Sequence, residues 1–440
     1  MFKLALVLRY LRKRKITVFP IAGVALGVLA LVVVLSVMEG FDTDFRARIR
    51  GIMPDMTVDF LDIYGYSGDV EKIVGRLEAM SEIRAASPYV SGLALAVVKI
   101  PSESNPLEES VSTEPVEFKG FDFEREAKVL GTNLTTHLKY EGSPFAGRPY
   151  GGPDAQAPLI VGARLAGAKF PGVRTKTTDW GRLDRGNVVK LLTFTPQYDR
   201  SALNGDVANV ISTGLYNIDS HTLFMPLDWA RAFRRVSPDS ISGISVALTK
   251  YNAATVAAAK EKIRKALSEE GAFNFSISTW EESRRTLLTA VAMERRIMAF
   301  ILFFFLVVAG FSISAILVMI VFEKIRDIGI LRAMGASSRG VAWTFLAYGV
   351  TIGVIGAGIG LALGVLFVEN LDSIESFVYV HTGWQPFPPD IYDLPAIPRI
   401  LNWWTNCYIV LTAVAVSFAA SVLPAVRAAW LDPVEAIRYE

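Results

Sequence analysis

Four long apolar runs limit what this chain can fold into more than any other feature of its sequence. Each run contains no Asp, Glu, Lys or Arg, and each exceeds the roughly 20 residues that a helix needs to cross a bilayer. Buried helices of soluble cores rarely reach such lengths, so the sequence predicts four transmembrane helices. The runs are Ile16–Met38, Ile297–Phe322, Val341–Val368 and Leu401–Val426.

The distribution of basic residues predicts how these helices are oriented. Residues 1–15, an amphipathic segment, carry six Lys and Arg and no acid, and residues 323–340 carry four basic and two acidic side chains. Residues 369–400 carry five acidic side chains and one basic one. Because loops rich in Lys and Arg stay in the cytoplasm, we expect both termini, including the tail 427–440, and residues 323–340 to be cytoplasmic. Residues 39–296 and 369–400 then lie on the opposite side.

Residues 39–296 are numerous enough to form a folded domain of one or two parts. Its flanks, residues 39–104 and 238–296, each carry a strand, a helix and a strand by their apolar patterns. Right-handed crossovers would let these two β-α-β units share one small sheet, as an α/β subdomain. The predicted strands are Met56–Leu61, Ile83–Ile100 (as one strand or two), Ile241–Leu248 and Phe273–Ile277, and the predicted helices are Asp69–Met80 and Ala253–Ser268.

Residues 105–237 predict a second, β-rich subdomain inserted into the first. Proline, glycine and serine interrupt the apolar pattern here more often than in the flanks. Within this part, Pro196–Gly205 is polar and rich in turn-forming residues, and it is either a solvated hairpin or a protruding contact element. The predicted elements are a helix over Pro158–Lys169 and strands over Asn187–Thr195, Val207–Asn217 and His221–Pro226.

Composition argues against an enzyme. Hydrophobic residues make up 52% of the chain, which fits a few spans and one large polar domain. The net charge of +2 provides no basic field for nucleic acid. One cysteine and three histidines, together with the absence of a P-loop and of hydrolase motifs, predict no catalytic residue, no metal and no cofactor on this chain. The spans hold no charged side chain, which argues against an ion-coupled transporter.

Glycines recur at helical spacing within the spans. Gly23 and Gly27 form one small-xxx-small step, and Gly356, Gly360 and Gly364 form a longer ladder. Such faces let helix backbones approach closely. The ladder packs either within the chain or between two chains, and the sequence leaves both open.

Residues 323–340 carry the strongest local pattern in the sequence. Four apolar residues recur every three positions and predict a stripe on a short helix, whose end Gly335 can cap. Charged side chains lie opposite the stripe. Such a helix either lies on the bilayer surface or docks into a groove of a partner. The stripe consists of Ile325, Ile328, Leu331 and Met334.

This loop resembles a known family. Residues Arg326–Ala336 resemble the coupling segment of four-span ABC permeases of the macrolide-exporter and cell-division-permease superfamily. Several other segments are similar to its lipoprotein-releasing branch. These segments are Leu35–Phe41 with Ile52–Pro54, Thr213–Ser220, Ile391–Pro395, and Pro424–Ala429 with Asp432–Glu440.

The resemblance implies a four-helix membrane protein with a large periplasmic α+β domain, in the inner membrane of a Gram-negative-type bacterium. The chain would be a permease subunit without its own ATPase site. The implied partners are a cytoplasmic ABC ATPase dimer that binds ATP and Mg, a second permease chain, identical or homologous, a lipoprotein substrate, a periplasmic lipoprotein carrier and membrane lipids. The residues that would contact the ATPase are Glu323, Arg326, Asp327, Ile328, Leu331, Arg332, Met334 and Gly335.

In this family a triacylated lipoprotein enters from the outer leaflet between the first and second spans of opposing chains, and is driven upward to the carrier. Depth along the spans predicts a cavity lined by Val34, Met38, Phe41, Met298, Ile301 and Phe305. The loop that hooks the carrier in heteromeric members corresponds to Phe194–Asp206, whose sequence departs from the familiar hook. Its predicted contact residues are Pro196, Gln197, Tyr198 and Arg200.

Two other functions remain open at this point. An efflux-type permease would move a soluble periplasmic substrate into an outer duct. A regulatory permease would control a periplasmic cell-wall hydrolase, and we would expect it to have a smaller outer domain than residues 39–296.

Overall fold

The computed structural model describes residues 17–101, 109–131, 137–140, 144–145, 150–152, 155–168, 182–384 and 397–432. The chain divides into two compact units. We call residues 17–43, 289–383 and 397–432 the membrane unit and residues 44–288 the extramembrane domain. The segment 1–15, most of the tail and the Ile391–Pro395 motif lie outside the described residues.

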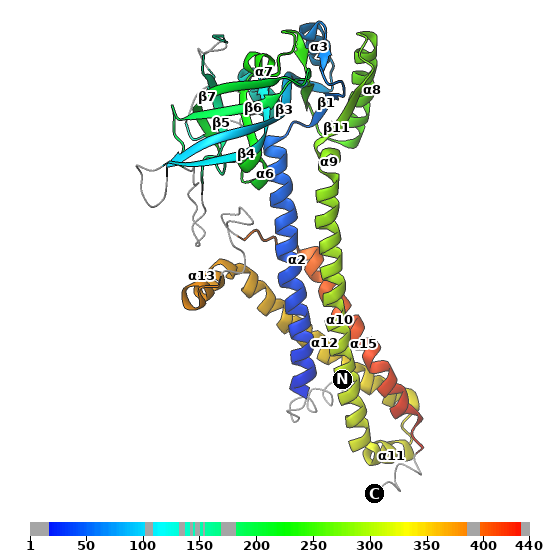
Figure 1. Ribbon diagram of the computed structural model, residues 1–440. Helices are drawn as coiled ribbons and strands as arrows, with labels where there is room; N and C mark the ends of the chain where they lie inside the picture. The colour runs from blue at the N-terminus through cyan, green and yellow to red at the C-terminus, as the bar shows by residue number, and fades with distance from the viewer. Residues whose placement is uncertain are drawn as a thin grey trace. The chain divides into compact units, whose positions relative to one another are not determined.

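Four long helices make up most of the membrane unit, and each is long and apolar enough to cross a membrane (Figure 1). Each contains nearly all of one predicted apolar run, so the prediction of four transmembrane helices is confirmed. Two helices continue past their runs at the ends that the chain connects to residues 44–288, which we call the domain-side ends. The helices are α2 (Val18–Ile52), α10 (Arg285–Glu323), α12 (Ser338–Glu369) and α15 (Trp403–Trp430).

Glycine lets α12 lie directly against α2. A Cβ added at Gly360 would lie 2.5 Å from the carbonyl oxygen of Ala25 and 2.8 Å from the Cβ of Val28. Gly356 and Gly364, one turn to either side, approach α2 in the same way. The predicted glycine ladder therefore packs within the chain.

Exposed tryptophans mark both ends of the membrane unit. Trp403 and Trp404 begin α15 and are 65% and 86% exposed. Trp343, near the start of α12, and Trp430, at the end of α15, are exposed at the other side. Because tryptophan concentrates at lipid–water interfaces, we expect the start of α15 to lie at the level of the lipid headgroups.

The first part of the extramembrane domain is a four-stranded antiparallel sheet in the order β11-β1-β10-β3. Two helices pack against it in one apolar core, with Ile73, Leu77, Ile263 and Leu267 among its buried residues. Two β-α-β units therefore share one sheet, as the sequence predicts. The elements are β1 (Met56–Phe60), α3 (Val70–Glu78), β3 (Ile83–Pro101), β10 (Gly243–Leu248), α8 (Ala253–Glu269) and β11 (Phe275–Thr279).

The second part is a closed ring of strands, because the order continues β3-β4-β8-β5-β7-β6 and β6 pairs again with β3. Its core is separate from that of the first part. The long strand β3 belongs to both: Ile83–Tyr89 pairs with β10, and Tyr89–Pro101 pairs with β4. The remaining strands are β4 (Glu109–Phe121), β5 (Ala157–Gly162), β6 (Val188–Phe194), β7 (Arg200–Ile211) and β8 (Thr222–Pro226).

Two sequence predictions in this part are wrong. The helix expected over Pro158–Lys169 is instead β5 followed by turns. All residues of β5 are buried, and a strand covered on both faces has a continuous apolar pattern that periodicity cannot distinguish from a helix. The strand expected over Val207–Asn217 instead runs from Arg200 to Ile211, because β7 pairs with β6 as far as Arg200, opposite Phe194. Tyr216 and Asn217 begin a short helix, α6 (Tyr216–His221). Most of the predicted loop Pro196–Gly205 is therefore strand.

Two glycines of α12 test the packing of this helix. We expect Gly360→Ala to destabilise the chain by about 1–3 kcal/mol, the usual cost of overpacking, because the added methyl group meets the backbone of α2. Gly358→Ala is the matched control, since no atom lies within 4 Å of its added Cβ. Thermal unfolding in detergent measures both, and equal melting temperatures would contradict the close packing of α2 and α12.

Candidate functional site

The predicted coupling segment contains a short helix, α11 (Ile325–Ala333). Its apolar residues do not form one exposed stripe. Ile328 is buried in a cluster with residues of α10, α12 and the end of α15. Leu331 and Met334 are 53% and 80% exposed, and Ile330 beside them is 44% exposed. The expected docking stripe is thus divided: its first half fixes α11 to the membrane unit, and its second half faces outward.

Polar contacts fix the end of α11. Gly335 has a φ of +97°, its N–H bonds to the carbonyl of Arg332, and Ala336 N–H bonds to the carbonyl of Leu331. These are the two bonds of a Schellman cap, so the predicted cap is confirmed. Arg332 Nη1 also donates to the carbonyls of Ala429, at 3.2 Å, and Leu431, at the end of α15. Arg332 therefore joins α11 to α15.

The other charged residues predicted for the coupling segment lie at the surface. Glu323, Arg326 and Asp327 are exposed. Asp327 accepts a hydrogen bond from Lys324 Nζ at 2.5 Å, one turn earlier. Their positions leave them accessible to a partner beside the exposed half of α11.

An apolar face runs along the middle of α10. Phe300, Phe304 and Phe311 are 64%, 54% and 72% exposed. The predicted cavity residues on α10 share this exposure, whereas those on α2 are half-buried. Their role as a lipoprotein cavity stays a prediction. The six are Met298, Ile301 and Phe305 on α10, and Val34, Met38 and Phe41 on α2.

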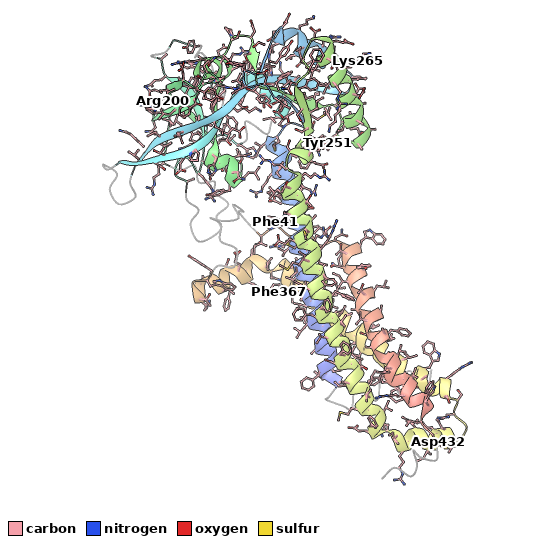
Figure 2. The ribbon with its side chains drawn as sticks, turned by 45° about the vertical axis from the view of Figure 1, so that its right-hand side comes forward. Phe41, Arg200, Tyr251, Lys265, Phe367 and Asp432 are labelled. Atoms are coloured by element: carbon pink, nitrogen blue, oxygen red, sulfur yellow. The ribbon has the colours of Figure 1, made fainter. Side chains whose placement is uncertain are left out.

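Within the extramembrane domain, the end of α2 and the start of α10 meet in an apolar cluster that we call the stalk joint. Ile49, Trp280 and Leu288 are 2%, 5% and 8% exposed in it. The ring of Tyr251, labelled in Figure 2, lies 6.2 Å from that of Trp280, and the guanidinium of Arg50 lies 5.4 Å from the Tyr251 centroid. Sequence patterns predicted the two helices but not their meeting, which joins residues far apart in the chain.

A buried carboxylate shapes the loop beside this joint. Asp219 is 1% exposed and accepts hydrogen bonds from Thr213 N and Oγ1, both at 2.8 Å, and from Gly214 N at 3.1 Å. The loop then reaches α2, where Arg48 Nη1 donates to the carbonyl of Gly214 at 3.4 Å. A Cβ at Gly214, whose φ is +69°, would clash with Arg48. This motif therefore attaches the ring of strands to α2.

The predicted carrier-contact residues lie at the turn between β6 and β7. Gln197, Tyr198 and Arg200 are exposed, with Tyr198 at 83% and a φ of 63°, whereas Pro196 is buried. Arg200 is labelled in Figure 2. The sequence did not reveal that exposed apolar residues lie beside this turn, on the neighbouring strands β3 and β6. They include Leu95 and its paired residue Leu192, together with Leu93 and Phe194.

A cavity of about 760 Å³ lies where α3, α4 (Phe123–Leu130) and α7 (Leu227–Arg234) begin. Its acidic residues include Asp69 and Asp122, whose side chains accept hydrogen bonds from the first backbone N–H groups of α3 and α4. These acids already stabilise helix ends, so their presence assigns no ligand to the cavity.

Comparisons with protein-family models and with the sequences of known proteins agree on one superfamily. Residues 17–266 match the MacB-like periplasmic core domain, and residues 299–433 match the FtsX-like permease C-terminal domain. The lipoprotein-releasing system transmembrane protein LolC of Neisseria meningitidis is 29% identical over 98% of both chains. LolE of Haemophilus influenzae is 24% identical, over 95% of this chain and 93% of its own. The crystal structure of the periplasmic region of MacB from Actinobacillus actinomycetemcomitans covers 54% of this chain and 95% of its own, at 18% identity and a TM-score of 0.31.

His137 predicts a pH dependence for the region beside the stalk joint. Burial lowers the pKa of His137 below 6.5, and the nearby charge of Arg48 adds to this effect. The contact of its Nδ1 with the carbonyl oxygen of Ser212, at 3.0 Å, opposes the lowering only in part. As pH falls below 6.5, His137 is therefore protonated in the unfolded chain before it is protonated in the folded chain. The free energy of unfolding consequently decreases as pH falls from 6.5 toward the lower pKa of the folded state.

The measurement is the melting temperature of the full chain in detergent between neutral and mildly acidic pH. We expect His137→Gln to flatten its decline, whereas the control His381→Gln, at an exposed histidine, should leave the decline unchanged. An unchanged slope in His137→Gln would contradict this assignment.

Proposed function

The chain belongs to the ABC permease family that combines a MacB-like periplasmic core domain with an FtsX-like permease domain, and we propose that it is the permease subunit of a lipoprotein-releasing transporter. Similarity to LolC over 98% of both chains is the observation that carries this proposal. The multi-pass membrane unit then lies in the inner membrane, with both termini in the cytoplasm and residues 44–288 in the periplasm.

In the proposed transporter, a separate cytoplasmic ATPase dimer binds ATP and Mg and docks on α11. The exposed Ile330, Leu331 and Met334 supply an apolar contact, and Glu323, Arg326 and Asp327 surround it with charge. Buried Ile328 and the bond from Arg332 to α15 hold α11 in place. A displacement of α11 is therefore transmitted to the helices it is packed against.

Two continuous helices suit transmission of this displacement to the periplasm. α2 has 35 residues and α10 has 39, which correspond to about 52 and 58 Å at 1.5 Å per residue. Both enter the stalk joint around Ile49 and Trp280. Because the joint is buried and the loop around Asp219 holds α2, movement of the helices is passed to the extramembrane domain as mechanical work.

The energetics of lipoprotein release require such a machine. Exposing acyl chains to water costs roughly 0.8 kcal/mol per CH₂, so three chains cannot leave the membrane spontaneously. The apolar side chains of α2 and α10, with Met38, Ile301 and Phe305 among them, would shelter the chains between this permease and a second one. The turn at Tyr198 and the apolar residues beside it would then meet the periplasmic carrier.

Depletion of the chain tests this function directly. We expect outer-membrane lipoproteins to accumulate in the inner membrane when the chain is depleted, because their acyl chains do not leave the bilayer spontaneously. Membrane fractionation and immunoblotting of several lipoproteins measure this, with an integral inner-membrane protein as the control. Normal delivery of all of them after depletion would refute the proposal.

The exposed half of α11 gives a prediction for the ATPase. We expect Leu331→Asp and Met334→Asp to abolish most lipoprotein-stimulated ATP hydrolysis by the assembled transporter, because a charge cannot enter an apolar groove without cost. Ile328→Asp should instead destabilise the permease itself, since Ile328 is buried.

The matched control is Leu61→Asp, at a leucine of the extramembrane domain that is 62% exposed. It should leave stimulation unchanged. Full stimulation in Leu331→Asp and Met334→Asp would show that α11 does not dock through this face.

A further inference from the structure

We propose that Glu39 holds α2, α10 and the start of α15 together by contacts that we call the clasp, and that α15 thereby acts as a second strut between α11 and the long helices α2 and α10. This inference deepens the proposed function and rests on it. Glu39 is a positioning residue, because its carboxylate acts through the helices that it joins.

Glu39 on α2 contacts both other helices. Its Oε1 accepts a hydrogen bond from Asn402 Nδ2 at 2.8 Å, at the start of α15. Its Oε2 lies 3.4 Å from Arg295 Nη2 on α10 and 3.4 Å from Thr405 Oγ1 on α15. The Glu39 side chain is only 18% exposed. Figure 2 labels Phe41, two residues further along α2.

The first turn of α15 contains no acidic residue of its own. Asn402 caps this helix, because its Oδ1 accepts a hydrogen bond from Trp404 N at 3.0 Å, and its amide nitrogen remains free to donate to Glu39. A carboxylate near a helix N-terminus is stabilised by the helix dipole. Glu39 thus supplies, from another helix, the negative charge that the start of α15 lacks.

The backbone around Glu39 fits this contact closely. A Cβ at Gly40 would lie 2.4 Å from the nitrogen of Arg399, so only glycine lets the segment before α15 lie flush against α2. Ile400 N donates to the carbonyl of Ser36 at 3.0 Å. Arg399 also pairs with Asp372 at 2.8 Å, on the short helix α13 (Leu371–Thr382) that follows α12. The start of α15 is therefore held by backbone and side-chain contacts.

The depth of the clasp strengthens its ion pair. Trp403 and Trp404 place the start of α15 at the lipid–water interface, where charges are less screened than in bulk water. Gly27 packs on Leu306 further along the same pair of helices, so α2 and α10 are held by packing there and by Glu39 and Arg295 at their domain-side ends.

α15 is consequently tied by polar groups at both ends. At one end Arg332 of α11 donates to its last carbonyls, and at the other Glu39 holds its first turn. A push on α11 reaches the stalk joint through α10 directly, and it reaches α2 through α15 by way of Glu39. Without the clasp, α15 can separate from α2 and α10 at the level of Glu39, and part of the stroke spreads the helices instead of moving the domain.

The test uses the complete transporter in proteoliposomes, with a fluorescent triacylated lipoprotein and the purified lipoprotein carrier. The readout is the ratio of lipoprotein released to ATP hydrolysed. We expect Glu39→Ala to retain ATP hydrolysis and to lower this ratio roughly five- to tenfold, a usual range for coupling between sites. Glu39→Gln, which keeps an acceptor for Asn402 but loses the charge, should have an intermediate effect.

The control is Glu294→Ala, at an exposed glutamate one residue before Arg295. It should keep the wild-type ratio. A wild-type ratio in Glu39→Ala would overturn the clasp. Absence of lipoprotein release by the wild-type transporter would instead refute the proposed function, so the two failures are distinguishable.

A cross-linking experiment distinguishes loss of the clasp from poor folding of the variant. In a Cys407→Ser background, which removes the natural cysteine, Glu39→Cys with Asn402→Cys should show the lowered ratio. A short bifunctional thiol reagent should then restore it by joining α2 to α15. A cross-linked transporter that stays uncoupled, or that stops releasing lipoprotein altogether, would show that the clasp is not a fixed strut.

Discussion

The membrane unit depends on one constraint, which is that apolar side chains gain nothing by leaving lipid for another helix. Association within a bilayer therefore relies on close packing and on polar contacts. The structure uses both, at different places. Glycines at positions such as 356 and 360 bring α12 against α2 along the apolar middle of the spans. Ion pairs and hydrogen bonds of Glu39 and Arg332 act only at the ends, where water and headgroups lower the cost of a charge.

Close packing in the middle of the spans and polar contacts at their ends suit a transporter whose helices must move while they stay associated. The middle of the bundle carries no charge that a stroke would drag through hydrocarbon. The polar ends fix α11 and the domain-side ends, which are the points where force enters and leaves in the proposed mechanism. An apolar face with Phe300, Phe304 and Phe311 stays exposed on α10 between these ends. That face is left for lipid, cargo or a second permease.

Sequence patterns predicted the structure correctly where one apolar period, that of a helix or that of a strand, continues over many residues. They located the four spans, the helices α3 and α8 and the shared sheet of the α/β part, because each has its own regular apolar pattern. They failed at β5, whose two buried faces erase the alternation, and at Ile328, whose burial depends on α12 and α15. They also missed the Glu39 clasp, because Glu39, Arg295 and Asn402 meet only through tertiary packing.

One shared strand joins the two parts of the extramembrane domain. Strand β3 pairs with β10 in one core and with β4 in the other, so the two parts cannot move apart without breaking a continuous strand. In the proposed mechanism, a displacement that reaches the stalk joint at Ile49 and Trp280 would also reach the turn at Tyr198, because this turn follows β6, which pairs directly with β3. A shared strand in place of a flexible linker would then couple the exposed turn to the movement of the helices.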